Sequence, residues 1–383
     1  MVNLHTELMV ALYRDFALPQ MSNVFANLKE QGVKNGEFFA GKFKGIPAII
    51  CGAGPSLEES LERLKQMEDR ALIFGGGSAL GPLSKHHIPL HFAAAIDPDP
   101  PSERFFNQTY FEVPLFYQNT VSSTLLSHHH GPKICMGESG CFELEKALVE
   151  DANLTFFNVG WNVSTFCVQL AVFLGCNPIS LVGMDLCVYE EASYAAGVDG
   201  KDQRKNPIEL FDREGKKVFT RPDFLMAKKW LEALAKNHPE ITFINATQGG
   251  LELEGISDHP LEVPKQSWDL RGKLHHILSE APELRFPVDK LPVLDNSLRK
   301  TGEILENLLQ ALKNGEKTIL QEIALEEEFF FQKHLRPLWE VWKDLLQSEE
   351  IILKMENVEF EKKLQECLFY KEVTEKFCHA RNS

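Results

Sequence analysis

The sequence has no excess of positive charge. Its 383 residues contain 40 lysines and arginines against 55 aspartates and glutamates, which gives a formal net charge of −15. Proteins that bind nucleic acid without sequence preference need a broad cationic surface, so the charge balance argues against a nucleic-acid partner. Small anionic ligands stay compatible with this charge, because backbone amides at helix N-termini bind them whatever the net charge.

Long apolar runs and paired cysteine motifs are also missing. No apolar run reaches about 18 residues, the length of a membrane span. The opening residues, MVNLHTELMVALYRDF, have no leading basic region of a signal peptide. The eight cysteines include no CxxC pair, which favours reduced thiols over a disulfide framework. We therefore expect a cytoplasmic protein with no membrane partner.

Two familiar phosphate-binding motifs are absent as well. The stretch AIICGAGPSLEESLERL, residues 48–64, passes from an apolar strand through a glycine turn into a helical pattern. A dinucleotide fingerprint would need a third glycine where Leu57 stands, and an acid where the second strand ends in Gly75–Gly77. No Gly-Lys-Ser/Thr sequence occurs to end a Walker A loop. The turn therefore belongs to neither motif.

The glycine turn can nevertheless hold a phosphate. Gly52 and Gly54 let a ligand approach the backbone, and the helix that Pro55 opens offers free N–H groups and a partial positive charge. Ser56 and Glu59 also fit a capping box. Two interpretations stay open, a helix start alone or a ligand-binding turn.

Apolar strands alternate with helical patterns over the first two thirds of the chain. Strands are expected in PAIICG, RALIFGGG, LHFAAAIDPDP, VPLFYQ, TFFNVG and PISLVGMDL, and helices in SLEESLERLKQM, SALGPLSKHH and STFCVQLAVFLG. This alternation predicts an α/β fold, a three-layer Rossmann-like domain with a mostly parallel sheet. We expect helices at 1–45, the α/β domain at 46–256, a proline-rich linker at 257–292 and a charged helical domain at 293–383, kinked at Pro337.

Acidic residues follow the ends of two expected strands, where open α/β sheets place their ligands. Asp97 and Asp99 could coordinate Mg²⁺ or contact a hydroxyl, or could belong to a solvated Asp-Pro turn. Asp185 could act as a general base or as a structural carboxylate.

The block NVGWNVSTFC supplies further candidates. Gly160 ends a strand, and Asn162 and Ser164 begin a buried helix, where they could bind a phosphate or a base edge or merely cap the helix. The histidine run at 128–130 favours a solvated loop, because adjacent side chains splay apart instead of converging on a metal. Tyr189 and Tyr194 follow on a loop that could close over a ligand.

The ordered blocks ICGAGPSLE, IDPDP and NVGWNVSTFCVQLAVFLGCNPISLVGMDL resemble the 6-hydroxymethylpterin diphosphokinase MptE-like superfamily, which includes the bacterial Maf motility-associated glycosyltransferases. The resemblance continues through YAAG, REGKKVFTRPDFLMAKKWLE and INATQGGLELEGI, so it spans residues 45–256. The glycine turn is also similar to that of bacterial sialyltransferases that bind CMP-activated nonulosonic acids. Trp161 departs from the family block, which has a small residue there.

The resemblance implies a transferase that uses a nucleotide-activated sugar, such as a CMP-nonulosonic acid, to modify a protein hydroxyl. A first alternative is a 6-hydroxymethylpterin pyrophosphokinase that uses ATP and Mg²⁺, with the metal at Asp97 and Asp99. A second alternative is a non-catalytic nucleotide-binding protein whose helical tail binds a partner. A homodimer is a further expectation. The expected catalytic residues are Asp97 and Asp185, and the expected nucleotide-binding residues are Gly52, Gly54, Pro55, Ser56, Gly76, Gly160, Asn162 and Ser164.

Overall fold

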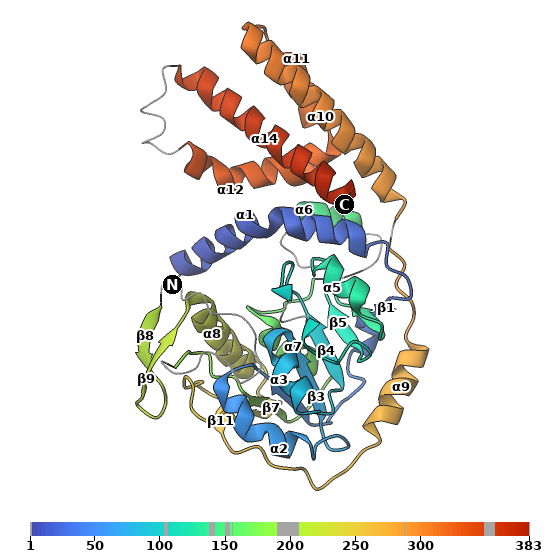
Figure 1. Cartoon of the computed structure of the whole chain (residues 1–383), viewed down its shortest axis with the longest axis vertical. Coiled ribbons are helices and arrows are strands. Elements are labelled where there is room, and N and C mark those ends of the chain that lie inside the picture. The colour runs from blue at the N-terminus through green and yellow to red at the C-terminus, as the bar shows by residue number, and fades with distance from the viewer. Residues whose placement is uncertain are drawn as a thin grey trace. The chain divides into compact units, whose positions relative to one another are not determined.

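The computed structural model describes residues 2–102, 106–137, 142–149, 154, 156–189, 207–286, 288–347 and 357–382 (Figure 1). The chain divides into two compact units. The α/β unit consists of Gln31–Gly137 and Phe157–Leu284, and the helical unit consists of Met1–Glu30, Glu138–Phe156 and Arg285–Ser383.

A parallel sheet forms the centre of the α/β unit. In the described part of the chain it has nine strands in the order β1-β6-β5-β4-β3-β2-β7-β10-β11, and all neighbouring strands pair in parallel. All residues of β2, β3 and β4 are buried, as expected for a parallel sheet covered on both faces. The strands are β1 Lys34–Asn35, β2 Ala48–Cys51, β3 Leu72–Gly76, β4 Phe92–Ala95, β5 Leu115–Tyr117, β6 Lys133–Cys135, β7 Ile179–Val182, β10 Phe243–Asn245 and β11 Ser257–Asp258.

Helices and one antiparallel hairpin surround this sheet (Figure 1). The apolar helix α7 packs on β2, β3, β4 and β7, which explains why it is apolar on nearly all sides. The expected α/β class with a parallel sheet is therefore confirmed. The surrounding elements are η1 Gly36–Phe39, η2 Pro55–Ser60, α2 Leu61–Leu64, η3 Gly77–Ala79, α3 Leu80–Lys85, α5 Ser123–His128, α7 Val163–Phe173, β8 Ile208–Phe211, β9 Lys217–Thr220, α8 Pro222–Asn237 and α9 Leu270–Glu280.

The strand order reverses direction at β2. From β2 the chain continues outward through β3, β4, β5 and β6, and then returns to β7 on the other side of β2. The loops after β2 and β7 therefore leave the sheet side by side at its carboxyl edge. Such a switch point is where open α/β sheets form a ligand crevice.

Two features of the sheet differ from the sequence-based expectation. Residues 156–159, expected as a strand, are irregular, and side chains bond to their carbonyl groups: Gln118 Nε2 donates to Phe157 O at 3.0 Å, and Thr165 Oγ1 donates to Val159 O at 2.9 Å. Conversely, the edge strand β1 and its neighbour β6 were not expected. Both are short: β1 is Lys34–Asn35 and has no apolar residue, and β6 has only two residues after Lys133.

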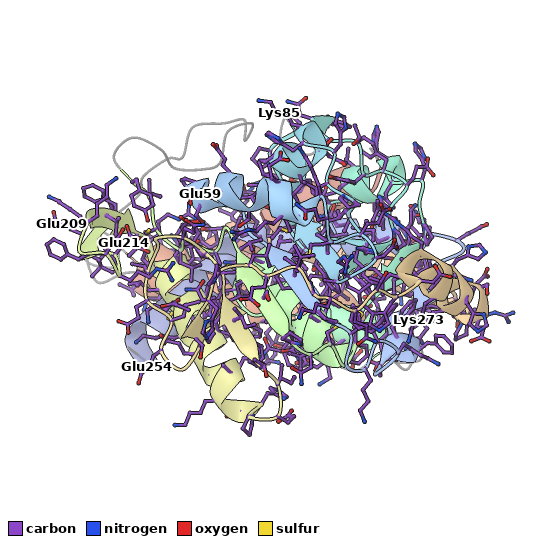
Figure 2. All side chains as sticks on the ribbon, turned by 90° about the horizontal axis from the view of Figure 1, so that it is seen from below. Glu59, Lys85, Glu209, Glu214, Glu254 and Lys273 are labelled. Carbon is purple, nitrogen blue, oxygen red and sulfur yellow. The ribbon has the colours of Figure 1, made fainter. Side chains whose placement is uncertain are left out.

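The expected capping box at Ser56 and Glu59 is wrong. The 3₁₀ helix η2 begins at Pro55 after Gly54, without a side-chain cap, and an α-helix starts only at Leu61. The Ser56 hydroxyl instead donates to a carboxylate 129 residues away in the sequence. Glu59 is exposed and is labelled on the surface in Figure 2. A tertiary hydrogen bond has replaced the local one.

The helical unit contains long helices, of which α10 is amphipathic. The helix α10 packs against α11 and α14, and α1 packs against α12 and α14. Pro337, where a kink was expected, lies in the first turn of α12, directly after the π-helical η5. It therefore stands at the start of a helix and not in the interior of one. The elements are α1 Val2–Asn27, α6 Glu143–Val149, α10 Lys290–Asn314, α11 Ile319–Glu326, η5 Phe331–Leu335, α12 Arg336–Leu346 and α14 Val358–Asn382.

The boundaries of the two units differ from the four expected regions. The first thirty residues group with the C-terminal helices instead of forming a region of their own. Within the expected linker, α9 contributes Leu270, Leu274 and Ile277 to the core of the α/β unit. Among the described residues, no helix combines the length and the apolar character that crossing a bilayer requires.

Candidate functional site

A cavity of about 290 Å³ lies at the carboxyl edge of the sheet. The loops after β2, β3, β4 and β7 and the N-terminus of α7 contribute to its wall. Its volume is at the low end of the range for small-ligand pockets. Seven of the expected site residues line it: Gly52, Gly54, Gly76, Asp97, Asn162, Ser164 and Asp185. Four do not: Pro55, Ser56, Asp99 and Gly160.

The glycines after β2 allow the turn after β2 to pack closely against the turn after β7. A Cβ at Gly52 would overlap the carbonyl oxygen of Gly183, and a Cβ at Gly54 would overlap the carboxylate of Asp185. Gly54 has φ −66°, a value open to any residue. These positions are therefore glycine because the β2 and β7 turns approach each other closely, whether or not a ligand also approaches them.

Asp185 is the buried acid of the cavity wall. Only 2% of its surface is exposed, Oδ2 accepts from the Ser56 hydroxyl at 2.7 Å, and Oδ1 has no hydrogen-bond partner. Burial raises its pKa to about 6, although the hydrogen bond from Ser56 lowers it. A carboxyl with such a pKa and one unpartnered oxygen can exchange a proton near neutral pH.

A second turn fixes the backbone of Asp185. Leu251 N donates to Asp185 O at 2.9 Å, and a Cβ at Gly250 would overlap the Asp185 backbone. Gly250 N also donates to the hydroxyl of Tyr189 at 2.8 Å. Tyr189 therefore lies behind the acid and not in the cavity wall, while Tyr194 lies outside the described residues.

The N-terminus of α7 is capped and still able to bind an anion. Asn162 Oδ1 accepts from Thr165 N at 2.9 Å, and Thr165 Oγ1 accepts from Asn162 N at 2.9 Å, which completes a capping box. The amides of Val163 and Ser164 precede the first intrahelical bond, and both residues line the cavity. Of the two readings of Asn162, capping is confirmed, and the amides beside it suit a phosphate.

Arg221 is a cavity residue that the sequence reasoning missed. It precedes Pro222 at the start of α8, donates from Nη2 to Asp223 Oδ2 at 2.9 Å, and holds its guanidinium 4.1 Å from the ring centroid of Phe224. Those contacts restrict its geometry, and a guanidinium can bind a phosphate through two parallel bonds. Its signal was an arginine between a strand and a helix-opening proline.

The two acids after β4 differ in position. Asp97 is exposed at the cavity wall. Its Oδ1 accepts a hydrogen bond from Asp99 N at 3.0 Å, which forms the Asp-Pro turn that was one of the two interpretations of the sequence. Asp99 does not line the cavity. No group of three or more histidines, cysteines or acids among the described residues is placed to hold a metal ion. The Mg²⁺ site at Asp97 and Asp99 stays a prediction.

His129 is also part of the wall, against the expectation of a solvated loop. It is 6% exposed, and its Nε2 has no hydrogen-bond partner. Burial lowers its pKa to about 4, so the ring is neutral at pH 7. A single buried histidine between two exposed ones could not be distinguished by spacing.

Residues 22–191 match the sequence profile of the family described as 6-hydroxymethylpterin diphosphokinase MptE-like. The matched segment, which is less than half of the chain, is similar to that family. It contains the β2, β3, β4 and β7 turns and the N-terminus of α7, and so the larger part of the cavity wall. Arg221 and Phe224 complete the wall from beyond the MptE-like segment.

Among solved structures, the chain is similar to the MAf glycosyltransferase from Magnetospirillum magneticum AMB-1, with a TM-score of 0.58 and 16% sequence identity. The similarity covers 96% of this chain and 59% of that one, so the chain spans less than two thirds of that protein's length. At this identity the similarity shows a shared fold. No curated protein matches the sequence.

Proposed function

We propose that this protein is a glycosyltransferase that takes a sugar from a nucleotide-activated donor. The observation that carries the proposal is the meeting of the α7 N-terminus, Arg221 and Asp185 in one cavity at the switch point of the sheet. Two of these groups suit a phosphate, and the third suits proton exchange. The shared fold with a MAf glycosyltransferase supports the same class of activity.

In such a reaction the bond between the sugar carbon and the phosphate oxygen breaks, and the phosphate leaves with the electron pair. The α7 amides and Arg221 would stabilise the charge that develops on it, because both are already in place before the reaction. The sugar carbon forms a new bond to an acceptor hydroxyl. The carboxylate of ionised Asp185 would accept the proton of that hydroxyl.

The proposed donor is a CMP-linked nonulosonic acid, and the proposed acceptor is a protein hydroxyl. Both follow from the sequence resemblance. Asp97, exposed at the cavity wall, would contact an acceptor or ribose hydroxyl. The protein acceptor and a homodimer stay predictions.

The test is nucleotide binding by the full chain. A thermal-shift panel of CMP, CDP, UDP, GDP and ATP, each with and without Mg²⁺, should show a raised Tm with at least one nucleotide. Arg221→Ala should weaken that binding by about 10- to 100-fold, because a charge-assisted bond is lost. Arg271→Ala, an exposed arginine of the same unit paired with Glu68, is the matched control. A Tm unchanged by every nucleotide would refute the proposal and leave a non-catalytic interaction protein.

The MptE-like match favours a second candidate, a pyrophosphokinase that transfers diphosphate from ATP to a 6-hydroxymethylpterin. That reaction would need Mg²⁺, for which Asp97, Asp99 and Asp185 are the available acids, and of these Asp97 and Asp185 line the cavity. An EDTA titration separates the candidates. Loss of nucleotide affinity with EDTA, and with Asp97→Asn, would favour the kinase, while indifference to Mg²⁺ would favour the glycosyltransferase.

A further inference from the structure

The residue that follows Asp185 has a backbone conformation that leucine rarely adopts. Leu186 has φ +52°, and among the described residues the other non-glycine residue with a positive φ is His87. The side chain of an L-residue in this left-handed region crowds its own backbone, so the conformation persists only where surrounding contacts hold it. Leu186 is buried and lines the cavity. The turn at Asp185 therefore depends on contacts from other elements.

The base of the β8–β9 hairpin supplies one set of these contacts. Thr220, the last residue of β9, is buried, and its hydroxyl donates to Leu186 O at 2.8 Å. Beside this bond, Val188 N donates to Phe219 O at 2.6 Å, and Phe219 N donates to Val188 O at 2.9 Å. The end of β9 therefore holds the backbone that directly follows Asp185.

The tip of the hairpin supplies a second set of contacts. There, Arg213 donates from Nη2 to Thr247 O and from Nη1 to Asp258 Oδ1 at 2.5 Å. Thr247 in turn accepts, at Oγ1, a hydrogen bond from Met184 N at 3.0 Å, and Met184 is the residue before Asp185. The hairpin thus contacts the backbone after the acid directly and acts on the backbone before it through Thr247.

These contacts meet at one turn, although the hairpin is a separate sheet. In the described part of the chain, β8 and β9 pair as strands only with each other, and an isolated bridge joins Phe219 to Val188. The hairpin lies at the edge of the α/β unit (Figure 1). Thr220 is followed directly by Arg221, the arginine of the cavity wall. The base of the hairpin therefore connects the turn of the acid to this arginine.

We propose that the β8–β9 hairpin holds Asp185 in its place in the cavity wall. The positioning residues are Thr220 at the base of the hairpin and Arg213 at its tip, and neither of them lines the cavity. The inference rests on the proposed function in taking Asp185 as the group that accepts the proton of the acceptor hydroxyl. Such a step depends on a carboxylate whose orientation is fixed before the reaction.

The experiment measures the pKa of Asp185 in the full chain without ligand. Carboxyl ¹³C NMR of aspartate-labelled protein follows the titration, and the loss of one resonance in Asp185→Asn assigns it. Burial holds this pKa at about 6, so a turn that relaxes towards solvent in Thr220→Val should lower it towards 3.8, the value in a free chain. Thr220→Ser keeps the hydroxyl and should keep the pKa at about 6.

The groups that act on the charge of Asp185 are Arg213, Cys187 and Tyr189. Burial raises the pKa of the Cys187 thiol to about 12 and the pKa of Tyr189 above its usual range, so both are neutral at pH 7. Thr220→Val changes none of the three, so a lower pKa reports a displaced carboxyl. Arg213→Lys is the second variant, because it keeps the positive charge and loses the forked pair of bonds. It too should lower the pKa of Asp185.

Thr374→Val is the matched control. Thr374 is a buried threonine of the helical unit whose hydroxyl donates to Tyr370 O at 2.7 Å, so its loss costs a similar hydrogen bond and should leave the pKa of Asp185 unchanged. An unchanged pKa in Thr220→Val, or in Arg213→Lys if the valine variant does not fold, would overturn the proposal. An equal fall in Thr374→Val would also overturn it, because it would show a general loosening of the fold. The measurement uses no nucleotide, so its failure is distinguishable from failure of the nucleotide-binding test of the proposed function.

Discussion

At the scale of single residues, Asp185 ties the stability of the fold to pH. Its pKa is about 6 in the folded protein and 3.8 in a free chain, so the folded state binds the proton more tightly. Burial of Asp185 therefore costs little free energy of folding below about pH 4, where the carboxyl is protonated in both states. The cost grows as the pH rises from there towards 6, where the carboxyl of the folded protein ionises as well. A shift of this size corresponds to about 3 kcal/mol.

We expect Asp185→Asn to gain stability relative to wild type between pH 4 and pH 7. The amide keeps a partner for Ser56 and carries no charge to bury. Denaturant unfolding of both proteins across this pH range measures the difference between their free energies of unfolding. The titration of the other acids is common to both proteins and cancels in this difference. A difference that does not change with pH would contradict the burial of an ionised carboxyl.

The hydroxyl of Ser56 stabilises the buried carboxylate of Asp185 through a hydrogen bond. We expect Ser56→Ala to cost about 1–3 kcal/mol at pH 7, because Oδ2 of a charged Asp185 then loses its hydroxyl donor. The loss should be smaller at pH 5, where the carboxyl is protonated. Glu59→Ala, which would matter equally in a capping box, should leave the Tm unchanged. Equal losses in the two variants would restore the local capping interpretation.

The sequence could locate Asp185, Asn162 and Ser164, because polar residues that end strands or begin helices in an α/β pattern converge at one edge of the sheet. It could not locate Arg221 or His129. Arg221 reaches the cavity from beyond the β8–β9 hairpin, and only tertiary packing distinguishes His129 from its exposed neighbours.

At the scale of elements, the turns after β2 and β7 are one packed unit. The buried strands were predictable because they are nearly continuous apolar runs, and α7 because it is apolar throughout. The start of η2 was not predictable, because a contact with the β7 turn decides it. Local signals fail where a contact between segments that are distant in the sequence determines the backbone conformation.

This packing predicts the effect of Gly54→Ala. The new Cβ would overlap the Asp185 carboxylate, so we expect a loss of about 1–3 kcal/mol despite an ordinary φ. Adding Asp185→Gly should recover part of it, which a double-mutant cycle of unfolding free energies measures. Gly302→Ala, inside α10, where the new Cβ would lie 4.0 Å from Thr374 Cγ2 in ordinary contact, should instead stabilise the protein. Strict additivity of the pair would refute the interlocked turns.

At the scale of the whole molecule, the helical unit is assembled from three separate segments of the chain. In it, Phe25 of α1 packs on Phe377 of α14, with ring centroids 5.1 Å apart. The sequence predicted a helical C-terminal region, because its leucines recur at helical spacing. It could not predict that α1 belongs to that unit, because no local pattern links helices at opposite ends of a chain.

This assembly determines how the chain can be divided. Removing residues 285–383 alone would uncover Met21, Val24 and Phe25 of α1, which are buried in the full chain, so we expect aggregation.

A variant of residues 31–284 with 138–156 replaced by a Gly/Ser linker should stay folded and soluble, because it keeps the core of the α/β unit intact. It should also bind nucleotide as the full chain does, since the cavity is lined by residues of the α/β unit. Size-exclusion chromatography and near-UV circular dichroism test the fold, and calorimetry compares the nucleotide affinity, with Arg221→Ala in the short variant as the control. A folded, soluble short variant that binds no nucleotide bound by the full chain would place helical-unit residues in the site.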